Sequence, residues 1–406
     1  NFLDYHNMQR FVGVVFSVAT IFPVYLLCSR YFKKSYSLLG ATLFIFEPKL
    51  IQNSFLGTPE SMYIFLMALL LFLFLSNNFK KIYLAFGIVA LLAITRYEGL
   101  LMIIPLSVVF FIRFRRQKKD LIKYIICISI FILILIPVAY LRNETSGQDG
   151  FISHISAGPE YYQASIQDNS SALTDFLYLG SINLIKFLGW ALIPSFIIFV
   201  PLGIIFIFKK IDYKKSTIIF TIVVMLLPAF YAYSRDIPEI KYIFVLYPIF
   251  CVLACFTFKI FLEKFHRRNL IFCIIIGGII LSSIIFVEWK AMDNEHYLEA
   301  YEILAEIGQK EMKINKEFGK SDGEFLYIHW VRVENAEKFP ILQKEIPPSK
   351  IKYVPMKITQ LHPDLYNLRD YFQSLEKQKV THLILDKYGN AQWHHELSLN
   401  LLDIFN

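Results

Sequence analysis

The chain has 406 residues, of which 56% are hydrophobic, with a mean hydropathy of +0.48 and a formal net charge of +8. An ordinary soluble domain is roughly 45 to 50% apolar, so this composition excludes a purely soluble protein. The basic residues cluster in short loops between apolar runs, so we expect no nucleic-acid partner and relate the excess charge to orientation in a membrane. All five cysteines fall in apolar segments, which indicates neither a disulfide set nor a metal cluster.

The sequence predicts a polytopic α-helical membrane bundle of about ten transmembrane or re-entrant helices in residues 1–287. A helix that crosses the bilayer needs about 20 apolar residues. The candidates in chain order are Phe11–Cys28, Ser37–Phe46, Ser61–Leu75, Ile82–Thr95, Leu100–Ile112, Ile122–Leu141, Phe187–Phe208, Ser216–Tyr233, Tyr242–Phe261 and Leu270–Val287. A helical hairpin at Thr95–Gly99 is predicted, because one helix over Ile82–Ile112 would put Lys81 and Arg113 on opposite sides of the membrane.

The charges of the loops predict an orientation, because Lys and Arg accumulate in short cytoplasmic loops. The basic connections are Arg30–Lys34, Lys80–Lys81, Arg113–Lys119, Lys209–Lys215 and Lys264–Arg268. The intervening connections are poorer in basic residues and are expected outside: Glu47–Glu60, Arg96–Gly99, Arg142–Lys186 and Ser234–Lys241. Two Asn-X-Ser/Thr triplets, at Asn143 and Asn169, fall in one of these outer loops. The sequence therefore predicts a multi-pass protein of the cell membrane whose C-terminal part is extracytoplasmic.

Residues 288–406 are densely charged and predict a small soluble α/β domain. The expected strands are Glu324–Trp330, Ile351–Val354 and Thr381–Leu385, with a helix over Leu365–Lys377, so a parallel sheet is one option. No glycine-rich phosphate loop is found there, which argues against a nucleotide site. His394 and His395 are adjacent and follow no recognised ligand spacing, so we expect no metal site from them.

Charged residues gather at the predicted outer edge of the membrane, where ionisable side chains are a functional hypothesis by default. Arg142, Lys186 and Asp236 are interpreted as residues that snorkel to the surface or cap helix ends. Glu60 and the pair Arg96 and Glu98 lie at junctions of short apolar segments, so they are predicted to face a protein cavity. Such a mixture suits a phosphorylated lipid, because cations hold its phosphate and a carboxylate acts as base on a hydroxyl.

Several of these segments together resemble a known group of enzymes. They are Arg10 before an apolar helix, Gly57-Thr58-Pro59-Glu60, Thr95-Arg96-Tyr97-Glu98-Gly99 and the run from Lys241 to Pro248. This order is similar to the GT-C superfamily of membrane glycosyltransferases, and most to its protein O-mannosyltransferase and aminoarabinose-transferase group, which is dolichyl-phosphate-mannose–protein mannosyltransferase-like. The resemblance covers most of residues 1–287.

The resemblance implies a glycosyltransferase that takes a sugar from a polyprenyl (dolichyl) phosphate, a donor held among membrane lipids. Transfer to an acceptor hydroxyl on a protein, lipid or glycan would occur at the outer face with inversion at the anomeric carbon. No nucleotide sugar and no certain cofactor are implied. Dependence on a divalent metal is left open, and no metal ligand is predicted.

The resemblance also implies roles for particular residues. The family's catalytic carboxylate lies in the first outer loop, and Asn1–Gln9 matches the tail of that loop. Asp4 is the acidic residue there, and a helix and the base itself are expected upstream of Asn1. Glu60 is implied as a catalytic or sugar contact, and Arg96 as a phosphate contact. The further phosphate or substrate candidates are Arg10, Lys49, Glu98, Arg235, Lys241 and Tyr242.

Two alternatives stay open at this point. A membrane transporter is expected to show inverted repeats with broken helices in matching positions, and the sequence shows no such repeat. A non-catalytic membrane scaffold predicts no transferase activity in the full-length protein.

Overall fold

The structure is a computed structural model that describes residues 5–114, 118–147, 149–153, 172–209, 211–235, 237, 239–265, 267, 269–289, 328–330 and 382–384. The chain divides into two compact units, Asn1–Val287 and Glu288–Asn406. In the described residues the first unit is helical, and the second contains two short strands.

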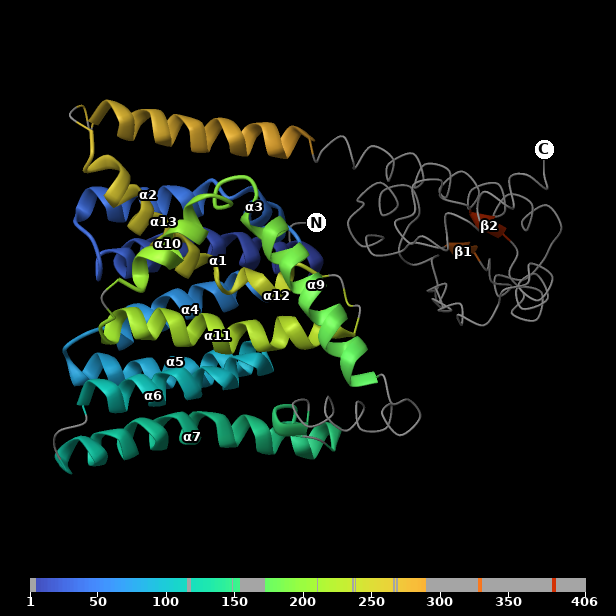
Figure 1. The fold of residues 1–406 in the computed structure, drawn as a ribbon. Coiled ribbons are helices and arrows are strands. Elements are labelled where there is room, and N and C mark those ends of the chain that lie inside the picture. Colours follow the sequence, from blue (N-terminus) through green and yellow to red (C-terminus); the bar gives the residue numbers. More distant parts are fainter. Residues whose placement is uncertain are drawn as a thin grey trace. The chain divides into compact units, whose positions relative to one another are not determined.

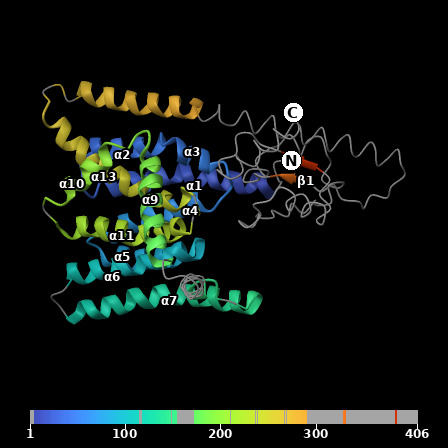
Figure 2. The ribbon, with the colours of Figure 1, turned by 45° about the vertical axis from the view of Figure 1, so that its right-hand side comes forward.

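Most of the long helices of the first unit lie side by side along one common direction, and α9 crosses them obliquely (Figure 1 and Figure 2). In chain order they are α1 (Tyr5–Cys28), α2 (Lys34–Ile45), α3 (Pro48–Ser54), α4 (Glu60–Phe74), α5 (Phe79–Thr95), the 3-10 helix η1 (Tyr97–Met102), α6 (Ile103–Phe114), α7 (Lys118–Ser146), α9 (Ala172–Leu192), α10 (Phe199–Ile207), α11 (Tyr213–Ser234), α12 (Lys241–Phe244) and α13 (Tyr247–Leu262). A last helix, Asn269–Trp289, follows.

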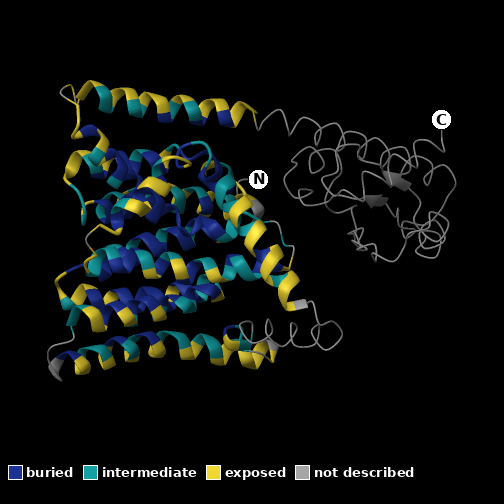
Figure 3. Cartoon of the chain, in the orientation of Figure 1, coloured by how far each residue is buried: buried dark blue, intermediate teal, exposed yellow. Residues whose placement is uncertain are grey.

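Among the described residues, five helices are long and apolar enough to cross a membrane: Asn7–Cys28, Tyr97–Phe114, Asp120–Thr145, Tyr213–Ser234 and Asn269–Trp289. Glu60–Phe74 and Tyr247–Leu262 are shorter apolar helices. Large apolar side chains stay exposed on the outer faces, for example Leu133 at 71% and Ile185 at 73%, and Figure 3 shows exposed residues along all of α7. Water does not solvate so much apolar surface, but lipid does. The prediction of a helical membrane protein is confirmed, and the number of ten crossings stays a prediction.

The connections between helices gather at the two ends of the bundle. At one end, Arg30 Nε donates to the carbonyl oxygen of Phe72 at 3.2 Å, and Lys214 Nζ donates to the carbonyl oxygen of Arg30 at 2.9 Å. Arg113 Nη1 donates to the carbonyl oxygen of Phe74 at 3.0 Å in the same region. These contacts join the connections that the sequence groups as basic, which lie at the left in Figure 1. Which side of the membrane this end faces stays a prediction.

The predicted hairpin at Thr95–Gly99 is confirmed. Helix α5 ends at Thr95, Arg96 has an extended backbone (φ −147°, ψ 130°), and η1 then leads into α6. Helix α5 and η1, the two arms of the hairpin, approach each other closely at Gly99. A Cβ added there would lie 2.6 Å from the carbonyl carbon of Leu92. Glycine is required at this contact because the neighbouring atoms belong to the backbone.

One predicted helix is wrong: the segment Phe187–Phe208 is interrupted. Helix α9 ends at Leu192 and α10 begins at Phe199, with Pro194 between them. Proline removes a helical N–H and clashes with the preceding turn, so continuous hydropathy was not enough to make a continuous helix. Two predicted loops are also partly helical, because α9 begins at Ala172 and α3 occupies Pro48–Ser54.

The core of the unit is centred on α13, which is buried along most of its length. It packs against α10, α2, α1 and α4. The largest fully buried side chains include Phe74, Phe86, Phe110, Tyr233 and Tyr247. Aromatic rings therefore fill much of the space between helices, and two of them carry hydroxyl groups that need partners.

In the second unit, β1 (Ile328–Trp330) pairs in parallel with β2 (His382–Ile384), with Ile328 opposite His382. Both strands fall within predicted β-like runs, and the parallel pairing is the option that the sequence left open. The other predicted elements of this unit, Ile351–Val354 and Leu365–Lys377, lie outside the described residues, as do His394 and His395. The α/β class of this unit stays a prediction.

Candidate functional site

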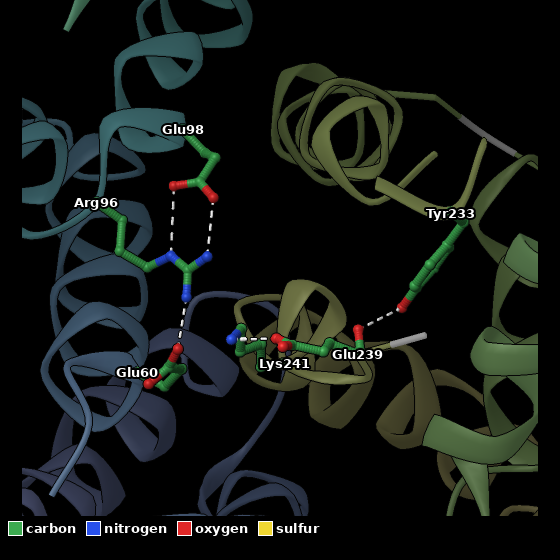
Figure 4. A network of polar contacts seen from close by, with 6 residues as sticks. All are labelled: Glu60, Arg96, Glu98, Tyr233, Glu239 and Lys241. Atoms are coloured by element: carbon green, nitrogen blue, oxygen red, sulfur yellow. Dashed lines mark hydrogen bonds and ion pairs between the residues drawn. The ribbon is translucent and has the colours of Figure 1, made fainter. Parts of the chain in front are cut away.

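Arg96 lies between two carboxylates that come from different helices (Figure 4). Its Nη1 donates to Glu60 Oε1 at 2.5 Å, while Nη2 donates to Glu98 Oε1 at 2.8 Å and Nε to Glu98 Oε2 at 3.3 Å. The second contact is bidentate, which fits the planar guanidinium to the planar carboxylate. The structure thus brings together three of the residues predicted from the sequence.

The local backbone explains why these side chains meet. Arg96 is the extended residue between α5 and η1, and Glu98 lies in the first turn of η1, so the two side chains are only two residues apart at this break in the helices. Glu60 is the first residue of α4, where the helix dipole favours a carboxylate. The turn before it depends on Gly57, whose φ of +71° is disfavoured for other residues. An added Cβ there would also approach Arg10 N at 3.2 Å.

The cluster is almost inaccessible to solvent: the side chains of Arg96, Glu60 and Glu98 are 15%, 5% and 6% exposed. Burial alone lowers the pKa of Arg96, but the hydrogen bonds and charge of Glu98 and the charge of Glu60 outweigh it, so the pKa is raised above its ordinary value. Arg96 is therefore always charged. One cation and two carboxylates give the cluster a formal charge of −1, which opposes an approaching anion.

Two polar atoms at this cluster have no hydrogen-bond partner within the described residues. They are Glu60 Oε2 and the hydroxyl of Tyr63, which lies one turn further along α4. Tyr63 is 4% exposed. Buried polar groups nearly always have a partner in proteins, so each such atom needs an explanation.

A small pocket opens beside Arg96. Its polar lining consists of Tyr63, Arg96, Glu98, Lys241 and Tyr242. The guanidinium carbon of Arg96 lies 5.9 Å from the ring centroid of Tyr63 and 5.6 Å from that of Tyr242. Sequence reasoning named four of these five residues and missed Tyr63. Its position three residues after Glu60 on one helix face was the signal that could have found it.

Lys241 is the cation on the more exposed side of this pocket. It begins α12 and forms an ion pair with Glu239 (Figure 4), and the two side chains are 40% and 38% exposed. The carbonyl oxygen of Glu239 accepts a hydrogen bond from Tyr233 Oη at 3.0 Å, which ties this connection to α11. An exposed ion pair contributes little net stability, so Lys241 can exchange its partner at small cost.

Of the other predicted site residues that the structure describes, Glu60, Arg10, Lys49 and Arg235 are not among the residues that line this pocket. Arg10 is half-buried on α1, and Arg235 is exposed, with Nη1 donating to Tyr231 Oη at 3.4 Å. Asp4 lies outside the described residues. Arg142, interpreted from the sequence as a capping or snorkelling residue, donates to the carbonyl oxygen of Ile94 at 3.3 Å.

Lys49 belongs to a second buried cluster. Its Nζ donates to the carbonyl oxygen of Ile193, which follows the end of α9. The same Nζ lies 3.8 Å from Glu47 Oε1 and 4.3 Å from the ring centroid of Phe286. Tyr247 Oη donates to the carbonyl oxygen of Ala191 at 2.7 Å. Lys49 and Tyr247 therefore satisfy carbonyl groups that the interruption between α9 and α10 leaves without helical partners.

Glu47 is fully buried in the connection between α2 and α3, next to Lys49 and the Tyr247 hydroxyl. Burial raises its pKa to about 8, although the charge of Lys49 opposes the shift. The Tyr247 hydroxyl donates to the Ala191 carbonyl oxygen, and neither carboxyl oxygen of Glu47 has a hydrogen-bond partner among the described residues. Burial is therefore the main cause of the raised pKa of Glu47.

Metal ligands were not predicted from the sequence. Within the described part of the chain, no group of three or more His, Cys, Asp and Glu side chains is arranged to hold a metal ion. At the main cluster, the space between the two carboxylates is occupied by the Arg96 guanidinium.

Residues 5–141 match the model of a protein family described as dolichyl-phosphate-mannose-protein mannosyltransferase. The predicted resemblance to dolichyl-phosphate-mannose–protein mannosyltransferases is confirmed for this segment. It runs from α1 into α7 and includes Glu60, Arg96 and Glu98, whereas Lys241 and Tyr242 lie beyond it. The matched segment is well under half of the chain.

The fold is also similar to that of the Archaeoglobus fulgidus oligosaccharyltransferase, whose crystal structure is a complex with Zn and sulfate. The TM-score is 0.49 at 16% sequence identity, and the similarity covers 79% of this chain and 48% of that one. The chain thus spans about half the length of that solved structure. A search of the curated proteins finds no match.

Proposed function

We propose that this protein is a membrane glycosyltransferase that moves a sugar from a polyprenyl (dolichyl) phosphate to an acceptor hydroxyl at the outer membrane face. The observation that carries the proposal is the buried cluster of Glu60, Arg96 and Glu98, of which Arg96 and Glu98 line a pocket together with Lys241 and Tyr242. Helix α12 and the turn between α5 and η1, which contribute lining residues, lie at the end of the bundle opposite the basic connections (Figure 1). The family match of residues 5–141 supports the class of enzyme.

The reaction is a single displacement at the anomeric carbon. The acceptor oxygen forms a bond to this carbon, the bond from the carbon to the phosphate oxygen breaks, and polyprenyl phosphate leaves, so the configuration inverts. A carboxylate takes the hydroxyl proton. Glu60 is our candidate within the described residues because its Oε2 has no hydrogen-bond partner there. The resemblance also offers Asp4 for this step.

Lys241 is assigned to the donor phosphate. It is a cation at the pocket with an exposed ion pair, whereas Arg96 is already bound by two carboxylates and belongs to a cluster of net negative charge. Arg10, Lys49 and Arg235 do not line the pocket and would need other roles, such as contacts to lipid or acceptor. The acceptor is a protein, lipid or glycan hydroxyl, and residues 288–406 form an extracytoplasmic α/β domain in this proposal.

The test is transfer by the full-length protein in proteoliposomes supplied with radiolabelled polyprenyl-phosphate sugars. Glu60→Gln keeps an oxygen that accepts from Arg96 but removes the basic carboxylate, so transfer should fall by about 10²-fold or more. Arg142→Ala is the matched control. Arg142 lies at the same end of the bundle but does not line the pocket, so its replacement should leave transfer unchanged within experimental error. No transfer by the unmodified protein from any polyprenyl-phosphate sugar would refute the function.

If the unmodified protein transfers sugar and Glu60→Gln transfers it equally well, the function stands and the assignment of Glu60 is refuted.

A further inference from the structure

The pocket beside Arg96 is not uniform: its buried side and its exposed side offer different chemistry. On the buried side, Arg96 uses Nε, Nη1 and Nη2 to bind Glu60 and Glu98, and the cluster is net negative. On the exposed side, Lys241 has an ion pair that is open to solvent. A phosphate is therefore favoured near Lys241 and disfavoured deeper in the pocket.

The buried side instead offers hydrogen bonds to uncharged groups. Tyr63 lines the pocket and is 4% exposed, and its buried hydroxyl has no hydrogen-bond partner among the described residues. A phenol both donates and accepts, which matches a sugar hydroxyl better than a phosphate beside two carboxylates. Its ring and that of Tyr242 lie over the Arg96 guanidinium and form apolar walls of the kind on which a sugar ring packs.

We propose that this buried side is a subsite for the hydroxyl groups of the transferred sugar, in which Tyr63 is the specificity-determining residue. The Tyr63 hydroxyl hydrogen-bonds a sugar hydroxyl, while the donor phosphate stays near Lys241. Glu60 Oε2 keeps the role given to it above. This assignment rests on the proposed function, since it concerns the same donor in the same pocket.

Binding of two lipids separates the two sides of the pocket. The full-length protein in nanodiscs is titrated with a polyprenyl phosphate and with the same polyprenyl phosphate carrying a hexose. Tyr63→Phe should weaken binding of the hexose-bearing lipid by about tenfold, the effect of one lost hydrogen bond, and leave binding of the bare phosphate unchanged. Lys241→Gln should weaken binding of both lipids, and less at high salt. Tyr83→Phe, on α5 and not in the pocket lining, should change neither.

Equal affinity of Tyr63→Phe and the unmodified protein for the hexose-bearing lipid would overturn the subsite, as would an equal loss for both lipids. In either case the unmodified protein still binds the donor, so the proposed function stands. Failure of the unmodified protein to bind either lipid would overturn the proposed function and the subsite together. Thermal unfolding of each variant without lipid shows whether a loss of binding comes from a loss of folding.

Discussion

Glu98 binds Arg96 through both of its carboxylate oxygens, at 2.8 and 3.3 Å, across a turn of only two residues. The same guanidinium reaches Glu60, which is 36 residues earlier in the chain. A local pair thus fixes the orientation of Arg96, and a long-range pair fixes the position of α4 relative to the hairpin between α5 and α6. The cluster is therefore part of the fold as well as the candidate site.

Removal of Arg96 should destabilise the protein strongly. Arg96→Met leaves two buried carboxylates without their cation, and the loss of one partner of a buried ion pair costs about 3 to 5 kcal/mol in the free energy of unfolding. The measurement is unfolding of the detergent-solubilised protein by SDS titration. The triple variant Arg96→Met/Glu60→Gln/Glu98→Gln carries no charge in this cluster. It should recover part of the lost stability but should not recover transfer. A single variant as stable as the unmodified protein would show that the cluster does not support the fold.

Glu47 should make stability depend on pH. Its pKa in the folded protein is about 8, above the ordinary value of 4.5, so between these values the unfolded chain has lost a proton that the folded chain keeps. Stability is therefore full below pH 4.5 and falls as the pH rises toward 8. Lys49, Tyr247 and Cys251 face this carboxyl. Glu47→Gln should remove this part of the slope, measured as the difference from the unmodified protein between pH 5 and 8. If the unfolding free energies of the unmodified protein and of Glu47→Gln change with pH in parallel, Glu47 is not protonated in the folded protein.

Gly99 should not tolerate a side chain. In Gly99→Ala the new Cβ would lie 2.6 Å from the Leu92 carbonyl carbon and 2.8 Å from Ala93 N, so the hairpin must open. We expect a loss of about 1 to 3 kcal/mol in unfolding free energy, together with reduced transfer as Glu98 moves relative to Arg96. Gly189→Ala is the control: it lies within α9 with nothing within 4 Å of the new Cβ. It should stabilise the protein by roughly 0.5 to 1 kcal/mol. Equal effects of the two substitutions would show that the hairpin arms are not in contact.

Two buried tyrosines should respond differently to loss of the hydroxyl. Tyr247→Phe leaves the Ala191 carbonyl oxygen without its donor and should cost about 1 to 3 kcal/mol. Tyr63→Phe removes a hydroxyl with no partner among the described residues and should leave the stability of the ligand-free protein unchanged or slightly higher. Both are measured by thermal unfolding without lipid. A large loss for Tyr63→Phe would mean that its hydroxyl has a structural partner, and would remove the basis of the sugar subsite.

Much of the candidate site could be predicted because its residues are charged and lie where apolar segments end. Glu60, Arg96 and Glu98 stand out against the surrounding hydropathy, and this contrast is visible without a structure. Tyr63 is not visible in this way, because a tyrosine in an apolar helix is ordinary until its hydroxyl is found without a partner. The charge of Lys49 predicts a substrate contact, and only the structure shows that its ammonium group binds a carbonyl oxygen of the chain itself.

The sequence by itself determined the membrane class, most helices and the hairpin at Thr95–Gly99, because hydropathy and loop charge depend on residue type and local order alone. Only the tertiary structure decided that Arg96 pairs with Glu60, that Lys49 binds Ile193 and that the predicted helix Phe187–Phe208 is interrupted. These features depend on which segments lie side by side. A buried polar group must find its partner among neighbours that the packing of the helices brings to it, and local sequence does not contain that information.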